Sequence, residues 1–548
     1  MNKLLLCKLL SLIAILIGGS MAFSLPWAFV DWSSEYDDFD WAREREGLVG
    51  LVAAMGVCFL VGGILRYLGR NSDGQLFRKE AMAVVGLSWL MATFLGGLPY
   101  RFSGTCRKPE VPMSRVDAMF EAQSGFSTTG ATVLTELEDP ALVPRCILFW
   151  RSSTHFLGGL GIIVLFVAIL GQGSAGKALM RAEMPGPSHY SPQARMQHTA
   201  WVLFLIYAGL NGLLTVLLLL EGLSLFDALC HAFGTMATGG FSTYNASIGH
   251  FATVPGLNGP LIEMTIVLFM FLAGTNFMLM YFVLLLKPRR LLADVEWRTY
   301  AALLLIVTVL VAAFGLGHHD FDSCGADRNQ ATLLPAADNP AEPNDRLPVA
   351  HALRYGLFQV VSIMTTTGFC TDDFDLWNSF SRGMLLVLMF VGGCAGSTGG
   401  GLKVIRHILF VKILRLEVEH AFHPSVVRPL RLAGKPVEDQ EPRKNILVYF
   451  GLIVAIFVVS WIFTITVEPD ATWTNHGHAA EHKLIDAAGC VAATLNNIGP
   501  GLGVIGATKN YTNFTPASKI LFVWLMMIGR LEIYVILVIF VPAFWRTQ

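Results

Sequence analysis

Ser127-Thr128-Thr129-Gly130 is a short polar turn beside a hydrophobic span, and three similar turns follow it in the chain. They are Met236-Ala237-Thr238-Gly239, Thr365-Thr366-Thr367-Gly368 and Asn496-Asn497-Ile498-Gly499. The glycines at 130, 239, 368 and 499 lie 109, 129 and 131 residues apart. This interval is too long for a solenoid repeat, but it suits two membrane helices with a re-entrant segment between them. Four such units around one axis predict a pore whose narrowest ring is built from the turns.

The composition indicates a membrane protein. Of the 548 residues, 54% are hydrophobic and 14% are charged, whereas a soluble domain carries about 25% charged residues. The formal net charge of −1 gives no basic excess for binding nucleic acid. The nine cysteines form no C-x-x-C pair, so we interpret them as small core residues rather than metal ligands or a disulfide framework.

Hydrophobic stretches predict ten membrane spans, of which the first two stand outside the fourfold scheme. We interpret the first as an uncleaved helix rather than a signal peptide, because its apolar stretch is long enough to cross about 30 Å of hydrocarbon. The expected spans are Leu4–Phe29, Gly47–Leu68, Ala81–Leu98, Cys146–Leu170, Thr199–Leu220, Leu261–Leu286, Thr299–Leu316, Gly383–Phe410, Ile446–Val467 and Lys519–Phe540.

The distribution of Lys and Arg predicts the orientation. Basic residues cluster in alternate connections, most densely from Lys403 to Lys444, and such connections face the cytoplasm. Both termini are then cytoplasmic, and the polar stretch His318–Leu347 is an extracytoplasmic loop with little fixed structure. The predicted units are 1–75 (two helices), 76–172 (repeat 1), 173–288 (repeat 2), 289–435 (repeat 3, with an intramembrane loop) and 436–548 (repeat 4).

A half-helix is expected before each turn. Asp117, Asp227 and Asp486 precede the turn glycines by 13, 12 and 13 residues, and Tyr355 takes this place in the third unit. We expect the aspartates to be N-caps at the positive end of the helix dipole. Irregular backbone at membrane depth requires protein or water around it, although amphipathic surface loops are an alternative. The residues expected to line the filter are Thr128, Thr129, Gly130, Thr238, Gly239, Thr366, Thr367, Gly368, Asn497, Ile498 and Gly499.

Carbonyl and hydroxyl oxygens in these turns suit a monovalent cation. The turns contain no Asp or Glu, which argues against a path for Ca²⁺ or Mg²⁺.

The third inner helix is interrupted by the glycine-rich run from Gly392 to Gly401. Each glycine costs about 1 kcal/mol against alanine in a helix, so we expect an intramembrane loop near the axis. A phosphate-binding loop and a serine nucleophile at Ser397 with His155 as its base are weaker alternatives. The residues expected to form a gate are Gly396, Ser397, Thr398, Gly399, Gly400, Gly401, Lys403 and Arg530.

Arg530 lies in an apolar stretch, where a charge costs at least about 2.5 kcal/mol and marks function. We expect it to face the axis below the filter and to bond to the loop's carbonyls and to the Ser397 or Thr398 hydroxyls; a purely structural clamp to Glu532 or to backbone is the alternative. A glycine also recurs in each inner helix, at Gly159, Gly274, Gly393 and Gly529, where close packing around a pore requires small residues.

These motifs resemble the Trk/Ktr/HKT superfamily of cation transporters, and most of all its TrkH branch. The similarity rests on Ser124–Thr132, Ala237–Ser242, Thr365–Phe369, Asn496–Gly501, Gly396–Gly401 with Lys403, and Gly529-Arg530. The resemblance implies an all-α polytopic fold of four pseudo-symmetric repeats around one pore, located in the bacterial inner membrane. It also implies K⁺ uptake, a homodimer, and a TrkA-type cytoplasmic nucleotide-binding partner. The polar stretch 318–347 is long for the family.

Two further implications concern selectivity and control. In plant relatives that favour Na⁺ a serine replaces the first filter glycine, so Gly130 points to K⁺ as the transported ion. The chain has no nucleotide-binding fingerprint of its own, and some of its cytoplasmic charges are expected to contact anionic lipids. A Na⁺-permeable member, a cation-coupled symporter, and a membrane enzyme or sensor that borrows the architecture stay open as alternatives.

Overall fold

The computed structural model is almost entirely helical. It describes residues 2–29, 41–72, 77–159, 196–318, 320–321, 348–423, 431–432, 435–436, 441–475, 477, 479–531 and 533–546. Residues 160–170 of the first inner span, nearly all of the polar stretch 318–347, and Glu532 lie outside this set. The strands in the described part form two short antiparallel pairs, β1 (Cys106–Lys108) with β2 (Val111–Pro112) and β3 (Arg431–Leu432) with β4 (Lys435–Pro436). The fold is thus that of an all-helical, multi-span membrane protein.

Two N-terminal helices pack along each other. Helix α1 (Lys3–Met21) continues into η1 (Ala22–Ala28) and lies against α2 (Trp41–Leu68). A Cβ on Gly18 would lie 2.8 Å from Cys58 Cβ, and one on Gly62 would lie 2.7 Å from Ile15 Cγ1. Small residues therefore allow the close approach of the two helices.

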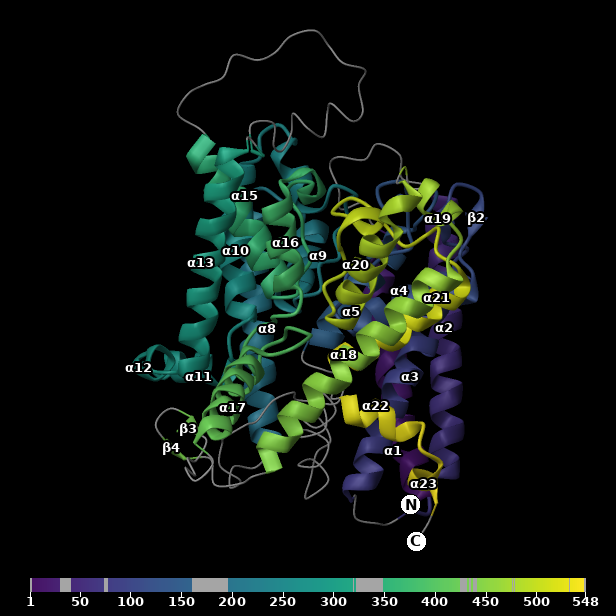
Figure 1. Ribbon diagram of the computed structural model, residues 1–548. Coiled ribbons are helices and arrows are strands. Elements are labelled where there is room, and N and C mark those ends of the chain that lie inside the picture. Colours follow the sequence, from purple (N-terminus) through teal and green to yellow (C-terminus); the bar gives the residue numbers. More distant parts are fainter. Residues whose placement is uncertain are drawn as a thin grey trace.

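The rest of the chain repeats an outer helix, a short helix and an inner helix four times (Figure 1). The outer helices are α3 (Arg78–Phe102), α8 (Met196–Leu220), α13 (Val295–Gly317) and α18 (Glu441–Val467). The short helices are α4 (Arg115–Phe126), α9 (Leu225–Met236), α15 (Pro348–Met364) and α20 (Lys483–Leu495). The inner segments are α5 (Arg145–Gly159), α10 (Gly259–Ala273) with α11 (Phe277–Leu284), α16 (Ser379–Leu388) with α17 (Val404–Phe422), and α21 (Pro516–Arg530) with α22 (Ile533–Ile539).

Shorter elements connect these helices or follow them. They are η2 (Ser247–Ala252), α12 (Arg289–Leu292), η3 (Phe374–Leu376), α19 (Ala471–Thr474), η4 (Ala480–His482), η5 (Gly503–Ile505) and α23 (Pro542–Trp545). The N- and C-termini lie close together at one end of the molecule (Figure 1).

The expectation that aspartates are the N-caps of the short helices is wrong. The cap of α4 is Ser114, whose Oγ accepts from Asp117 N–H at 3.1 Å while Asp117 Oδ2 accepts from Ser114 N–H at 3.1 Å. Ser224 likewise caps α9 through Asp227 N–H at 3.1 Å. Each aspartate is therefore the third helical residue and completes or supports a capping box. It still lies in the first turn, where a carboxylate favours the positive end of the helix dipole.

Several inner segments are not the continuous spans expected from hydropathy. In the described residues six helices are individually long and apolar enough to cross a membrane, and the pair α10–α11, bent by 104°, makes a seventh. The expected spans Leu261–Leu286, Gly383–Phe410 and Lys519–Phe540 are each broken near the middle. At the first break Asn276 Oδ1 accepts from Met278 N–H at 2.8 Å and starts a new helix. Hydropathy missed these breaks because apolar residues continue on both sides.

Candidate cation pathway

The four turns share one backbone conformation. Just after each short helix a non-glycine residue has a positive φ, which is uncommon: 52° at Thr128, 54° at Thr238, 61° at Thr366 and 55° at Asn497. The next residue in each turn donates its N–H to a carbonyl five positions back, from Thr129, Gly239, Thr367 and Ile498 to Ser124, Gly234, Ser362 and Ala493 at 2.8–2.9 Å. Four copies of this arrangement indicate four equivalent sites.

The register of the second turn differs from the expectation by one residue. The glycine with positive φ in each turn is Gly130 (79°), Gly240 (77°), Gly368 (79°) and Gly499 (91°). Gly240 therefore replaces Gly239 as the counterpart of Gly130, and Gly239 corresponds to Thr129. The interval from Asp227 to Gly240 is 13 residues, as in the other units. The adjacent glycines made the choice ambiguous, and this constant interval was the signal that decides it.

The turns close into a ring. A Cβ on the glycine of each turn would lie within 2.4 Å of a carbonyl oxygen of the next turn. The four contacts are Gly130 to Gly239 O at 2.2 Å, Gly240 to Thr367 O at 2.0 Å, Gly368 to Ile498 O at 2.0 Å, and Gly499 to Thr129 O at 2.4 Å. The last contact returns to the first turn. Any side chain at these positions would clash, so glycine is required by close approach as well as by φ.

One face of the ring opens into a small vestibule. A cavity of about 90 Å³ is lined by Gly130, Gly240, Gly368 and Gly499 together. Tyr511, which also lines it, donates its hydroxyl hydrogen to Gly499 O at 2.9 Å. All four turns therefore meet a single space rather than separate pockets.

Buried polar groups hold the first two turns together. Arg151 Nε donates to Glu121 Oε1 at 2.6 Å, and both side chains are at most 2% exposed. Glu121 Oε2 accepts from Val133 N–H at 3.0 Å, and Arg151 Nη1 donates to Ser242 O at 3.0 Å. The pair thus joins the segment after the first turn to the segment after the second.

His155 joins the same two units. Its Nε2 accepts from Phe241 N–H at 3.1 Å, so Nδ1 carries the proton and donates to Gly125 O at 2.8 Å. Ser397 Oγ instead donates to Cys394 O at 2.6 Å. The two side chains are engaged with different partners, so the arrangement does not support a serine nucleophile with His155 as its base.

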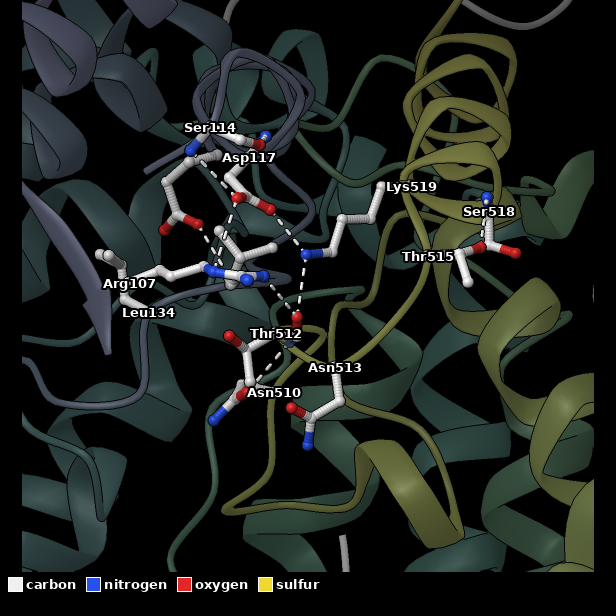
Figure 2. Close-up of polar contacts among 12 residues, drawn as sticks. Arg107, Ser114, Asp117, Leu134, Asn510, Thr512, Asn513, Thr515, Ser518 and Lys519 are labelled. Atoms are coloured by element: carbon white, nitrogen blue, oxygen red, sulfur yellow. Dashed lines mark hydrogen bonds and ion pairs between the residues drawn. The ribbon is translucent and has the colours of Figure 1, made fainter. Parts of the chain in front are cut away.

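The first and fourth units, which are not consecutive in the chain, are joined by a buried ion pair (Figure 2). Lys519 Nζ of α21 donates to Asp117 Oδ1 of α4 at 2.6 Å, and the two side chains are 2% and 3% exposed. Lys519 and Arg107 both donate to Thr512 O at 3.0 Å. The sequence analysis missed this pair, although a lysine at the start of an apolar helix was a visible signal.

The glycine-rich segment covers the face of the ring opposite the vestibule. Gly400 N–H donates to Thr366 Oγ1 at 2.8 Å, and Gly401 N–H donates to Gly529 O at 3.3 Å. A Cβ on Gly400 would lie 2.6 Å from Asn497 Cβ. Residues 392–403, called here the intramembrane loop, therefore pack against the turn residues. Because these amides already have acceptors, the loop does not present them to a phosphate.

Arg530 ties this loop to two other units. Its guanidinium donates to Thr398 O, to Gly158 O at 2.6 Å and to Gly159 O at 2.7 Å. The arginine is 9% exposed. Within the loop, Lys403 Nζ donates to Gly399 O. The expected bond between Arg530 and a loop carbonyl is present, but the loop hydroxyls bond elsewhere, Ser397 Oγ to Cys394 O and Thr398 Oγ1 to Ala273 O at 3.1 Å.

The recurring inner glycines lie where the inner segments touch the short helices. A Cβ would lie 2.9 Å from Ala237 Cα at Gly159, 3.0 Å from Thr365 Cγ2 at Gly274, and 2.1 Å from Leu495 O at Gly529. At Gly393 it would lie 2.9 Å from Gly274 O. Small residues thus allow the inner segments to reach the ends of the short helices.

Comparisons with known proteins decide the family. The family described as TrkH, cation transport protein, matches residues 50–547. The chain belongs to the TrkH family of cation transport proteins. The resemblance inferred from the motifs is therefore confirmed, and the chain belongs with transport proteins rather than enzymes.

Individual relatives align over most of their length. The chain is 35% identical to the Trk system potassium uptake protein TrkH of Salmonella typhimurium over 493 residues, covering 89% of this chain and 91% of that one. The same identity is found over 496 residues with TrkH of Escherichia coli K12, with 89% and 91% covered. The crystal structure of the potassium transporter TrkH from Vibrio parahaemolyticus matches with a TM-score of 0.78 and 29% identity, covering 100% of both chains.

Proposed function

We propose that this chain takes up K⁺ across the cytoplasmic membrane through one pore formed by the four turns. The observation that carries the proposal is the closed ring, in which each turn glycine abuts a carbonyl of the next turn. The potassium uptake named for the similar Trk proteins supports the choice of ion. In this proposal the outer, short and inner helices form four pseudo-symmetric repeats, with the units bounded as predicted from the sequence.

The filter is proposed to be the backbone of the four turns. The carbonyls of Thr129, Gly239, Thr367 and Ile498 lie at equivalent positions of the ring and would replace the hydration shell of K⁺. The remaining proposed filter residues are Thr128, Gly130, Thr238, Gly240, Thr366, Gly368, Asn497 and Gly499. The turns contain no carboxylate, so they favour a monovalent over a divalent cation.

The gate is proposed to be the intramembrane loop together with Arg530. The loop packs against the turns, and the Arg530 guanidinium fixes Thr398 O while adding a positive charge. At a separation of about 4 Å, K⁺ and a guanidinium repel by about 4 kcal/mol for an effective dielectric constant of 20. Opening then requires the loop and the arginine to separate. The proposed gate residues are Gly396, Ser397, Thr398, Gly399, Gly400, Gly401, Lys403 and Arg530.

Control is proposed to come from the cytoplasmic side. The chain ends lie together (Figure 1), and Arg289, Arg290 and Arg298 in and beside α12 are exposed. Such a basic surface suits a soluble TrkA-type partner through complementary charge, with anionic lipids covering part of it. A homodimer in the cytoplasmic membrane, with both termini cytoplasmic, completes the proposal. A Na⁺-permeable or cation-coupled transporter is the alternative that the experiment below addresses.

The test is uptake of radioactive Rb⁺ into proteoliposomes that contain the purified chain. We expect saturable uptake that unlabelled K⁺ competes for more strongly than Na⁺. Equal competition by Na⁺ would contradict K⁺ selectivity, and a dependence of uptake on an imposed pH or Na⁺ gradient, beyond its electrical effect, would indicate coupling. Liposomes lacking the protein provide the background.

A further inference from the structure

A buried carboxylate on the outer helix of the third unit contacts both ends of the intramembrane loop. Glu296 Oε1, near the start of α13, accepts from Ala395 N–H at 2.7 Å and from Ile405 N–H at 3.0 Å. Ala395 precedes most of the glycine run, and Ile405 lies in the first turn of α17, just after it. One oxygen atom of a residue that is 8% exposed therefore joins two amides ten positions apart in the chain.

The contact also compensates for a missing helix cap. Lys403 is the N-cap residue of α17, and its side chain makes no cap hydrogen bond. The first amides of a helix have no partner within that helix, and a carboxylate is favourable at its positive end. Glu296 supplies that carboxylate from another helix. The position of the loop and the start of α17 are thus tied to α13.

The remaining contacts of the loop are made by main-chain groups and Arg530. Cys394 N–H donates to Gly274 O at 2.9 Å, and Phe277 N–H donates to Gly396 O at 3.0 Å, both at the break between α10 and α11. These bonds do not restrain the far end of the loop, where it meets α17. Because glycine-rich backbone has more freedom to lose than other sequences, fixing both ends has a large effect on its position.

We propose that Glu296 is the latch of the intramembrane loop, a positioning residue that holds the loop against the filter by accepting from both ends at once. The proposal rests on the proposed function, because it assumes that the loop is the barrier to K⁺. Glu296 acts through the loop and does not contact the transported ion. The latch also lies only four residues after α12, beside the exposed arginines proposed to meet a partner.

The test compares three substitutions at this position by Rb⁺ uptake into proteoliposomes without any partner. Glu296→Ala removes the acceptor, so we expect uptake to rise three- to tenfold. Glu296→Asp keeps the charge but is one methylene too short to reach both amides, so we expect a two- to fivefold rise. Glu296→Gln retains an amide oxygen at the same reach and should stay within twofold of the parent. Leu305→Ala, on an exposed position of the same helix, is the control for disturbance of α13.

A second measurement follows the loop directly. Cys394 in the loop is 1% exposed, so its modification by a soluble thiol reagent reports loop movement in full-length protein whose other cysteines are replaced. We expect modification to be at least five times faster in Glu296→Ala and Glu296→Asp, and unchanged in Glu296→Gln and Leu305→Ala. This measurement does not depend on ion flux.

The outcomes separate the latch from the proposed function. Parental protein that carries Rb⁺, with unchanged uptake and Cys394 modification in the Ala and Asp variants, would overturn the latch alone. Equal acceleration by Gln and Ala would also overturn it, because the acceptor would then not be the deciding group. Parental protein that carries no Rb⁺, while Cys394 still responds to the substitutions, would overturn the proposed function and leave the latch as a structural contact.

Discussion

The two faces of the ring are held by different kinds of contact. The short helices and the segments next to the vestibule are joined by buried ion pairs, such as Arg151 with Glu121 and Lys519 with Asp117 at 2.6 Å, and Arg354 with Glu263 at 2.6 Å. The opposite face is covered by a glycine-rich loop held mainly by hydrogen bonds to main-chain groups. Breaking a buried ion pair costs about 3–5 kcal/mol, whereas a typical hydrogen bond contributes about 1 kcal/mol. We infer that the filter is built to stay fixed and the loop is built to move.

The largest effect is expected on the movable face, at Arg530. Replacing Arg530 with alanine removes both the positive charge and the bond to Thr398 O, so Rb⁺ uptake without a partner should rise about tenfold, equivalent to about 1.4 kcal/mol of barrier. Uptake should also depend less on a partner. Arg530→Lys keeps the charge without the guanidinium fork and should give an intermediate rate. If the alanine variant inserts, folds and transports no faster than the parent, Arg530 is only a structural clamp.

The next effect concerns the packing of the loop against the turns. A Cβ at Gly400 would lie 2.6 Å from Asn497 Cβ, so Gly400→Ala should push the loop away and raise uptake about threefold to fivefold, less than 1 kcal/mol of barrier. Gly383→Ala is the matched control, because no atom lies within 4 Å of its added Cβ. Equal rates for the two variants would show that the loop does not press on the turn.

On the fixed face, the glycines of the ring should control selectivity. In Gly130→Ser and Gly240→Ser the added side chain meets Gly239 O and Thr367 O respectively. It should widen or distort the ring and increase competition by Na⁺ several-fold relative to K⁺. Gly212→Ser, in open space on α8, should leave the competition unchanged. An effect at Gly130 without one at Gly240 would contradict the corrected register of the second turn.

The Lys519–Asp117 pair should affect stability more than transport. Lys519→Met leaves the Asp117 carboxylate buried, and we expect a loss of about 3–5 kcal/mol, seen as a lower Tm in detergent. Adding Asp117→Asn should restore part of this loss, because the uncompensated charge is removed. Lys483→Met is the control, since its partner Asp470 is 70% exposed and such pairs contribute about 0–1 kcal/mol. Equal losses in both single variants would argue against this pair as the closure of the ring.

The smallest effect is a pH dependence on the vestibule side. Burial raises the pKa of Asp375 to about 6, even though its carboxylate accepts from Gly503 N–H and lies 3.8 Å from Lys509 Nζ. The folded protein therefore binds this proton more tightly than the unfolded chain does. The resulting stabilisation is fully present below pH about 4 and is lost as the pH rises through about 6. Between pH 5 and pH 7 the Tm should fall by about 2 °C from this group, and Asp375→Asn should remove that part of the slope.

Much of the architecture could be predicted from the sequence, because apolar spans and polar glycine turns directly reflect membrane depth and backbone conformation. The short helices, the glycine-rich loop and the family belong to this group. The breaks after Gly274 and at Arg530 were missed because hydropathy records composition and not the capping of a new helix by Asn276. The register at Gly239-Gly240 was wrong because φ is not visible in two adjacent glycines. The division of the chain into five units stays a prediction.

Contacts between distant segments were the least predictable part of the site. Lys519 meets Asp117 across 402 positions, and Glu296 meets the loop across 99 and 109 positions. A single sequence contains the charges but not their pairing, because the pairing is set by the packing of four units around one ring. Arg530 was predicted to face the loop only because its charge in an apolar helix required a polar partner.

The central claim is that K⁺ passes through the ring formed by the four turns. The most direct measurement is anomalous X-ray diffraction from crystals of the full chain grown in Rb⁺. The account predicts a Rb⁺ peak enclosed by the carbonyl oxygens of Thr129, Gly239, Thr367 and Ile498, and loss of the peak when Na⁺ replaces Rb⁺. An empty ring, in protein from a preparation that takes up Rb⁺ in proteoliposomes, would contradict it.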